Sequence, residues 1–173
     1  MAYDFHGAWE SVTNFNAALY AAPGDPSTGG AATTFNVDAA VQAYLGRGVP
    51  PGKLVVGMPF YGRAWQGVPA TNDGLFQPAT GAVPGSYEAG ILDYQDIAPR
   101  LSTYTRRYSP EAQVPWLYSA QAGVMISYDD AESIARKAEY VNAEGLGGAM
   151  LWELSGDDDQ STLLTAVRDT LAE

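Results

Sequence analysis

The feature that most constrains the fold is a pair of short apolar runs that have no polar face. They are Lys53 to Phe60 (KLVVGMPF) and Gly147 to Leu154 (GGAMLWEL). A strand that is exposed on one face alternates apolar and polar residues, whereas a strand buried between layers does not. We therefore expect both runs to be parallel strands that lie between helices.

Helical stretches alternate with these runs. Residues 36–45 begin at Asn36 or Asp38 as the N-cap and carry apolar residues at helical spacing. Residues 129–145 start with a potential capping box, Asp-Asp-Ala-Glu, and residues 161–171 form the last helix. Residues 1–4 resemble the end of another strand. This order predicts a parallel α/β layer or barrel.

Between the two apolar runs, residues 64–123 have a different composition, rich in Gly, Pro, Tyr and Thr. Short β-like runs at 114–118 and 124–128 and a short helix near 93–104 indicate a small α+β domain. We expect this domain, residues 64–123, to be inserted into a first domain made of residues 1–63 and 124–173. Most of its aromatic residues are expected to form its own core, and they are Tyr87, Tyr94, Tyr104, Tyr108, Trp116 and Tyr118.

Composition excludes several classes of function. The 173 residues include no cysteine, so no disulfide, thiolate zinc site or thiol nucleophile is available. The net charge of -11 opposes binding to a polyanion such as nucleic acid. No apolar run approaches the ~18 residues of a membrane span, and the N-terminus lacks the pattern of a signal peptide. A neutral polymer is compatible with these properties.

Polar and aromatic residues stand where the predicted strands end. They are Tyr3 and Asp4, Tyr61 and Arg63, and Trp152 and Glu153, with Trp9 in the first loop. The carboxyl ends of parallel strands meet at one face of a barrel, where active sites lie. Tyr and Trp combine an apolar face with a hydrogen-bonding tip, which suits the apolar face and the hydroxyl rim of a sugar. A carbohydrate is therefore the expected ligand.

Four motifs in order along the chain resemble glycoside hydrolase family 18, the chitinases. Residues 1–9 (MAYDFHGAW) resemble its M-x-Y-D strand end, and residues 57–65 (GMPFYGRAW) resemble its following strand. Residues 147–154 resemble its last barrel strand, and residues 128–133 (YDDAES) resemble the helix start after the insertion domain of one chitinase subfamily. One such motif is weak evidence, whereas four in order are specific.

The resemblance implies the C-terminal portion of a (β/α)8 TIM barrel, with strands resembling the sixth to eighth, and a small α+β insertion domain. It implies retaining, substrate-assisted hydrolysis of the β-1,4 linkages of chitin and N-acetylglucosamine oligomers. Tyr3 would donate a hydrogen bond to the acetamido carbonyl, and Asp4 would support the polar network beneath the sugar. The substrate-binding residues would be Met1 in the -1 pocket, Trp9 on the leaving-group side, Tyr61 and Arg63 on sugar hydroxyls, and Trp152 as the floor.

The general acid of the family lies in a D-x-x-D-x-D-x-E motif, which this sequence does not contain. A complete barrel needs about 250 residues. We therefore expect the chain to be part of a longer, secreted chitinase and to be inactive alone. We also expect it to pair with the missing N-terminal half of the barrel or with a second copy of the chain, because an open sheet exposes apolar edges.

Other interpretations remain open. A non-catalytic, lectin-like chitin-binding relative would use the same Tyr and Trp residues without turnover, and an autonomous α/β domain of unrelated function is a third alternative. Tyr61 and Arg63 could be a structural pair. Glu153 should point to the opposite strand face from Trp152 and form a structural salt bridge.

No cofactor and no metal are expected. His6, the only histidine, is interpreted as a polar loop residue, because a single His without a Cys or a second His is a poor metal site. Residues 157–159, three consecutive aspartates, are interpreted as a solvated helix entry that suits the helix dipole, with calcium only weakly indicated.

Overall fold

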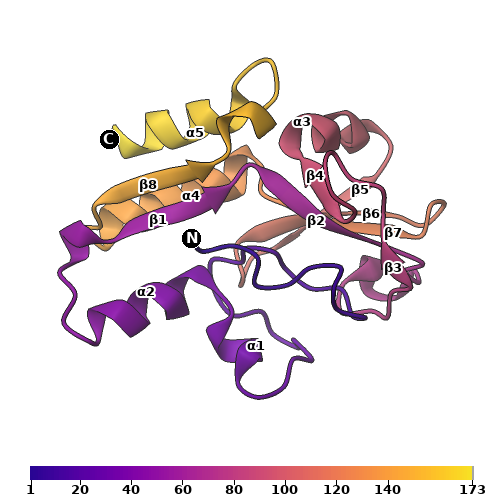
Figure 1. Ribbon diagram of the computed structural model, residues 1–173, viewed down its shortest axis with the longest axis horizontal. Helices are drawn as coiled ribbons and strands as arrows, with labels where there is room; N and C mark the ends of the chain where they lie inside the picture. Colours follow the sequence, from indigo (N-terminus) through magenta and orange to yellow (C-terminus); the bar gives the residue numbers. More distant parts are fainter. Residues whose placement is uncertain (173) are drawn as a thin grey trace.

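A computed structural model describes residues 1–172 (Figure 1). It consists of a two-stranded parallel sheet and a six-stranded antiparallel sheet, with helices around the first. The helices are α1 (Ala31–Thr34), α2 (Val37–Leu45), α3 (Tyr94–Ile97), α4 (Ala131–Ala143) and α5 (Thr162–Leu171). The strands are β1 (Val55–Pro59), β2 (Tyr61–Gln66), β3 (Gly81–Ala82), β4 (Ile91–Asp93), β5 (Thr105–Ser109), β6 (Val114–Ser119), β7 (Val124–Ser127) and β8 (Gly148–Trp152). Short 3-10 turns occupy Pro51–Lys53, Thr71–Gly74, Ala98–Ser102 and Leu154–Gly156.

The parallel layer consists of β1 and β8, which pair from Val55 opposite Gly148 to Pro59 opposite Trp152. The predicted parallel pairing of the two apolar runs is therefore confirmed. Helices α4 and α5 pack against each other beside this pair, and α2 lies on its other side (Figure 1). Most of β1 is buried, but β8 is only half-buried and ends at the exposed Trp152. The expectation that both runs are covered on both faces holds only for β1.

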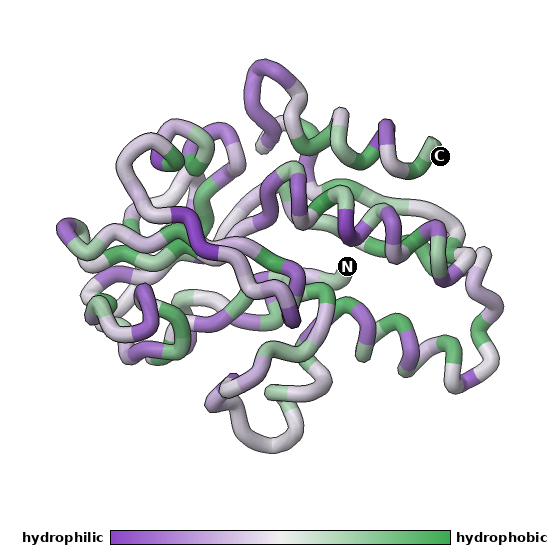
Figure 2. The backbone as a smooth tube through the Cα atoms, turned by 180° about the vertical axis from the view of Figure 1, so that it is seen from behind, coloured by the Kyte–Doolittle hydropathy of each residue, from purple (hydrophilic) through white to green (hydrophobic). Residues whose placement is uncertain are grey.

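The antiparallel sheet runs in the order β3-β2-β7-β6-β5, and β4 pairs with β2. Its two faces contribute to two different hydrophobic clusters, because side chains alternate along a strand. Ala64, Leu117 and Ile126 join the cluster that extends to α4 and α5, whereas Trp65 and Met125 join the other. Figure 2 shows that hydrophobic residues follow the strands and the inner helix faces. Both faces of the central strands β2, β6 and β7 are therefore covered, whereas the first three residues of the edge strand β5 are exposed.

The predicted helices are confirmed, with one correction at a cap. The Asn36 side chain accepts a hydrogen bond from the Ala39 N–H at 2.8 Å and caps α2. Helix α4 does begin with a capping box, but its partners are Asp130 and Ser133 rather than Asp129 and Glu132. Asp129 is occupied elsewhere, because its carboxylate binds Lys137 in the interior.

Two other differences concern the strands. Residues 1–4 form no regular strand, and a 3.3 Å hydrogen bond from the Ala2 N–H to the Gly57 carbonyl joins them to β1. The antiparallel sheet also includes β2 and β5, which sequence patterns did not predict, and β2 spans the expected domain boundary at residue 63. The predicted helix near 93–104 is present as α3 and the 3-10 turn that follows it.

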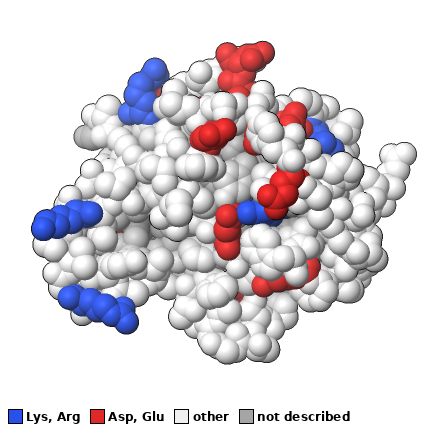
Figure 3. All heavy atoms as spheres, viewed as in Figure 1, with Lys and Arg blue, Asp and Glu red and all other residues white. Residues whose placement is uncertain are grey.

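Charged side chains are unevenly distributed over the surface. On the face in Figure 3, acidic side chains gather near the centre and the top, whereas most of the visible Lys and Arg lie toward the edges. Among the helices of residues 1–172, none has the length and apolar character needed to span a membrane.

Candidate active site

Asp4 lies at the centre of a hydrogen-bonded group at the C-terminal ends of the parallel strands. Its Oδ1 accepts hydrogen bonds from the Tyr61 hydroxyl at 2.7 Å and from Arg63 Nε at 3.0 Å. Arg63 Nη2 lies 2.8 Å from the same oxygen. Arg63 is buried and Asp4 is exposed, so the arginine fixes a carboxylate that faces solvent.

The backbone turns sharply to present this carboxylate. Asp4 has a φ of 60°, in the left-handed region, and its N–H donates to Asn16 Oδ1 at 2.9 Å. The Asn16 N–H in turn donates to Ser127 Oγ at 2.8 Å. A side chain from β7 therefore positions the first loop, and the loop positions Asp4.

Tyr3 places a buried hydroxyl beside this group. The hydroxyl has no hydrogen-bond partner among the described residues, and its ring meets the Tyr61 ring edge-on at 5.8 Å. Burial and the negative charge of Asp4 raise the pKa of Tyr3, so the hydroxyl keeps its proton. Gly57 makes room for the ring, because a Cβ there would lie 3.1 Å from Tyr3 Cε1 and 2.8 Å from Met1 Cα. Tyr3 therefore keeps its proton on a buried hydroxyl that has no partner among the described residues.

Trp9 packs over the same arginine. The Arg63 guanidinium carbon lies 4.8 Å from the centre of the Trp9 ring, within range of a cation–π interaction. Gly7 allows the ring to fold back over the loop, because a Cβ at Gly7 would lie 2.2 Å from the Trp9 ring. The ring remains 59% exposed and offers a flat surface beside the Asp4 group.

A pocket of about 210 Å³ opens next to Asp4. Trp152 forms part of its wall and is 53% exposed. Burial raises the pKa of Asp93, which also lines this pocket. The lining residues are Asp4, Tyr61, Arg63, Tyr87, Glu88, Ile91, Asp93, Trp152 and Glu153. The pocket thus combines aromatic surface with several carboxylates.

The structure brings together most of the residues predicted from the sequence. Asp4, Tyr61, Arg63 and Trp152 line one pocket, while Tyr3 and Trp9 contact members of this group. Met1 lies apart from the pocket. It is 84% exposed and lies in a groove formed by residues of α2 and β1.

Several residues of the site carried no recognisable sequence signal. Asn16 and Ser127 act through hydrogen bonds between segments that are 111 residues apart. Glu88 and Asp93 lie within residues 64–123, where no strand end was predicted. For Asp93, the one available sequence signal was its position in the otherwise apolar segment ILDY, which is compatible with a buried carboxylate.

Glu153 differs from its sequence interpretation, and His6 is more buried than the sequence indicated. Glu153 lines the same pocket as Trp152, because β8 ends at Trp152 and strand alternation no longer applies. Its carboxylate accepts a hydrogen bond from Ser155 Oγ at 2.6 Å and forms no salt bridge within the described chain. His6 lies in a loop, as expected, but it is only 4% exposed, and its Nδ1 lies 2.8 Å from Glu10 Oε2.

The three consecutive aspartates serve the start of α5. Asp157 accepts hydrogen bonds from the N–H groups of Leu163 and Leu164, and Asp158 accepts one from the N–H of Thr162. This agrees with the predicted helix entry, although two of the three carboxylates are held rather than solvated. In residues 1–172, no group of three or more His, Cys, Asp or Glu side chains is arranged to hold a metal ion.

Comparisons with known proteins agree with this geometry. The family model of glycosyl hydrolases family 18 matches residues 1–157. Chitinase A1 from Niallia circulans is 45% identical over 166 residues, which cover 93% of this chain and 24% of that protein. The structure of chitinase ChiA74 from Bacillus thuringiensis has a TM-score of 0.91 and 40% identity, covering 99% of this chain and 31% of that one.

A human relative carries a different description. YKL-39, described as a pseudo-chitinase with retained chitooligosaccharide binding properties, has a TM-score of 0.90 at 27% identity and covers all of this chain and 50% of its own. The chain spans less than half the length of the curated relatives it matches. Its fold is therefore that of a portion of the family's (β/α)8 barrel, and the chain belongs to glycosyl hydrolase family 18.

Proposed function

We propose that this chain is part of a chitinase that hydrolyses the β-1,4 linkages of chitin and N-acetylglucosamine oligomers with retention. The observation that carries the proposal is the Asp4 carboxylate, held by Tyr61 and Arg63 at the mouth of a pocket walled by Trp152. An aromatic wall beside a fixed polar group suits a sugar ring. The family match and the chitinase relatives support the same substrate class.

The proposed roles follow from which polar atoms are free. The Tyr3 hydroxyl has a proton to donate and no partner among the described residues, so it suits an acetamido carbonyl oxygen. That oxygen is the nucleophile in substrate-assisted hydrolysis, and a donor would orient it beneath the anomeric carbon. Asp4 would support the polar network beneath the sugar. Arg63 and Tyr61 hold Asp4 and would also contact sugar hydroxyls.

We propose that the acid which protonates the leaving group comes from outside this sequence. The sequence lacks the family's acid motif, and Glu153 is held by Ser155 at the end of β8. Hydrolysis would then need the rest of the barrel, supplied as its missing N-terminal half or by a second copy of the chain. Strand β8 is only half-buried in this chain, which supports the proposal that such a partner covers it.

A second candidate function is binding without turnover. The pseudo-chitinase relative has the same fold over this whole chain, and its description states that chitooligosaccharide binding is retained. In this alternative Trp9, Tyr61 and Trp152 would form a sugar-binding surface in a lectin-like protein. The two candidates differ in whether the longer protein carries an acid upstream of Met1.

The test measures fluorophore release from a labelled N-acetylglucosamine dimer by the purified chain, together with calorimetric binding of the hexamer. We expect no turnover and measurable binding that Trp152→Ala weakens at least about tenfold, as for a stacking residue worth over ~1.4 kcal/mol. Tyr44→Ala, at an exposed aromatic residue of α2 that does not line the Asp4 pocket, is the control and should bind normally. Turnover by the isolated chain, lost in Glu153→Gln, would contradict an external acid.

Two broader assignments are proposals of the same kind. We propose the division into residues 1–63 with 124–173 and an insertion domain of residues 64–123. The two separate sheets support two units, although β2 crosses the first boundary and β7 of the antiparallel sheet lies beyond the second. We also propose that the parent protein is secreted, because insoluble chitin is reached only outside the cell. The outcome of the fluorophore-release and binding measurements depends on neither the domain division nor secretion.

A further inference from the structure

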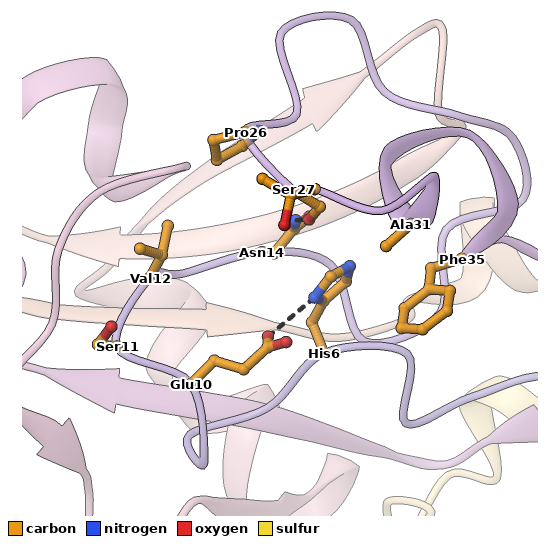
Figure 4. Close-up of a pocket in the computed structure, with 10 residues that line it drawn as sticks. His6, Glu10, Ser11, Val12, Asn14, Pro26, Ser27, Ala31 and Phe35 are labelled. Carbon is orange, nitrogen blue, oxygen red and sulfur yellow. Dashed lines mark hydrogen bonds and ion pairs between the residues drawn. The ribbon is translucent and has the colours of Figure 1, made fainter.

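The first loop lines a second pocket, of about 330 Å³, that shares no residue with the pocket beside Asp4. It lies between the segment that follows Asp4 and the segment that leads into α1 (Figure 4). Its lining residues are His6, Glu10, Ser11, Val12, Asn14, Pro26, Ser27, Thr28, Ala31 and Phe35. Neither the family match nor the relatives' descriptions assign a role to this pocket.

His6 gives the pocket a specific hydrogen-bonding group. The side chain is only 4% exposed, and its Nδ1 lies 2.8 Å from Glu10 Oε2. Because the carboxylate only accepts, Nδ1 donates in this contact, and in the neutral tautomer Nε2 would be an acceptor. The Nε2 atom is itself buried and has no partner among the described residues. In Figure 4 this nitrogen faces the space bounded by Ser27, Ala31 and Phe35.

The opposite wall is held in place by hydrogen bonds that centre on the buried Asn14 side chain and on Asp25. The Asn14 amide, 3% exposed, donates to Asp25 Oδ1 at 3.0 Å and to Ser27 Oγ at 3.3 Å. Asp25 also accepts from the Ser27 N–H at 2.8 Å. These contacts preorganise the polar side of the pocket, which lowers the entropy cost of binding.

An apolar surface completes the pocket. The Phe35 ring centre lies 5.6 Å from the His6 ring centre, and Phe35 remains 46% exposed. Val12, Pro26 and Ala31 add apolar surface. No Lys or Arg lines the pocket, and Glu10 contributes a negative charge, so an anionic ligand is disfavoured.

We propose that this pocket binds a single pyranose ring at a site distinct from the Asp4 pocket. A sugar hydroxyl would donate to His6 Nε2, and further hydroxyls would reach Ser27 and Glu10. The apolar face of the ring would pack on Phe35. A pocket of about 330 Å³ is at the small end of the range for ligand sites and suits a monosaccharide. Sugar binding in this pocket is independent of the proposed hydrolysis at Asp4.

The test follows the imidazole nitrogen resonances of His6 by NMR in the 173-residue chain during titration with N-acetylglucosamine. We expect the Nε2 resonance to shift as sugar is added. The shift should saturate at millimolar sugar, as for a site that holds one ring with a dissociation constant of about 1 mM. Trp152→Ala is the matched control, because it alters only the other pocket, and the His6 titration should be unchanged. An Nε2 shift no larger than that caused by equal concentrations of glycerol would overturn the proposal.

Ligand-observed saturation-transfer NMR extends the test to variants of the pocket. In a Trp152→Ala background, which disables the proposed sugar surface of the Asp4 pocket, we expect His6→Phe to weaken N-acetylglucosamine binding at least about tenfold, because the hydrogen-bonding group is lost. His6→Gln keeps a polar side chain and serves if the phenylalanine variant fails to fold, and it should bind with an intermediate affinity. Phe35→Ala should weaken binding about fivefold. Equal sugar binding by these variants and the Trp152→Ala chain would contradict the assignment.

Discussion

The two sheets of this chain differ in how completely they are covered. All four residues of β7 are buried, and so are Val114 to Tyr118 of β6, because two hydrophobic clusters cover the two faces of the antiparallel sheet. In the parallel layer, β1 is buried from Val56 onward, but no residue of β8 is fully buried. The central strands of the antiparallel sheet are thus covered within this chain, although its edge strand β5 is mostly exposed, whereas β8 of the parallel layer is not fully covered at any residue.

Because of this difference, the residues that hold the candidate site and the residue that offers an exposed surface belong to different sheets. The site lies where the two sheets meet, since Asp4 follows the segment beside β1 while Tyr61 and Arg63 belong to β2. Residues on the well-covered sheet hold the carboxylate, and the exposed Trp152 at the end of β8 offers the surface. We infer that the antiparallel sheet supplies rigidity to a site whose ligand surface lies on the less-covered layer.

The largest expected effect comes from the buried ion pair that joins the two regions. Lys137 in α4 and Asp129, directly after β7, are each about 1% exposed, with Nζ 2.6 Å from Oδ2. Burial acts against both charges, raising the pKa of Asp129 and lowering that of Lys137. Lys137→Met leaves Asp129 without its partner and should cost about 3 to 5 kcal/mol, measured by urea denaturation.

The neighbouring position on α4 gives the control for this change. Arg136 pairs with Glu139 at 2.9 Å, with both side chains about half exposed. Arg136→Met should therefore cost less than ~1 kcal/mol. The double variant Lys137→Met, Asp129→Leu should recover much of the loss, because it removes the uncompensated carboxylate. If both single variants lowered stability equally, burial would not decide the strength of these pairs.

A second prediction compares leucines from the two sheets. Leu117 of β6 is fully buried, so Leu117→Ala should cost about 2 to 5 kcal/mol. Leu151 of β8 is only half-buried, and Leu151→Ala should cost about 1 kcal/mol. Thermal unfolding of both variants measures the difference. A cost for Leu151→Ala as large as that for Leu117→Ala would show that β8 is covered in solution.

The sequence predicted the parallel layer better than the antiparallel sheet. The runs that became β1 and β8 are continuous apolar segments, and α2 and α4 carry recognisable caps. By contrast, β5 reads TRRYS, and its pairing with β6 depends on contacts that local patterns do not encode. The half-burial of β8 was also missed, because an apolar run indicates potential burial and not whether a neighbour is present.

Site residues on strand ends were predicted, whereas residues that act through distant contacts were not. Tyr61 and Arg63 follow an apolar run, and the structure places both on Asp4. Asn16 lies in a loop with no periodic pattern, and its contact with Ser127 follows only from the fold. The burial of His6 depends on the segment around Phe35, which also has no local signal.

A smaller effect is expected from alkaline pH. Burial, with a smaller contribution from nearby Asp158, raises the pKa of Tyr94 to about 12, against about 10 in the unfolded chain. Because the pKa of Tyr94 is higher in the folded chain, its neutral phenol contributes its full share to the free energy of unfolding below pH 10. That contribution is lost as the pH rises toward 12. At pH 11 the loss is about 1.4 kcal/mol. Tyr94→Phe should remove this part of the pH dependence in denaturation curves.

The control for the pH effect keeps the same aromatic change at an exposed position. Tyr87 is 79% exposed, so Tyr87→Phe should leave the pH dependence of stability unchanged. If Tyr94→Phe and the unmodified chain lost equal stability between pH 9 and pH 11, burial of this phenol would not contribute to the alkaline sensitivity.

The smallest effect on stability is expected at the uncovered edge of the parallel layer. Val55 at the start of β1 is 53% exposed, and the nearby Tyr44 is 58% exposed. Val55→Lys should change the free energy of unfolding by less than ~0.5 kcal/mol, because little apolar surface is lost and the lysine stem can lie along the strand. The charge should reduce association between copies, measured by sedimentation over a range of concentrations. A loss of more than ~2 kcal/mol would mean instead that Val55 is covered by another chain in solution, and the contrast between the sheets would then belong to the isolated chain only.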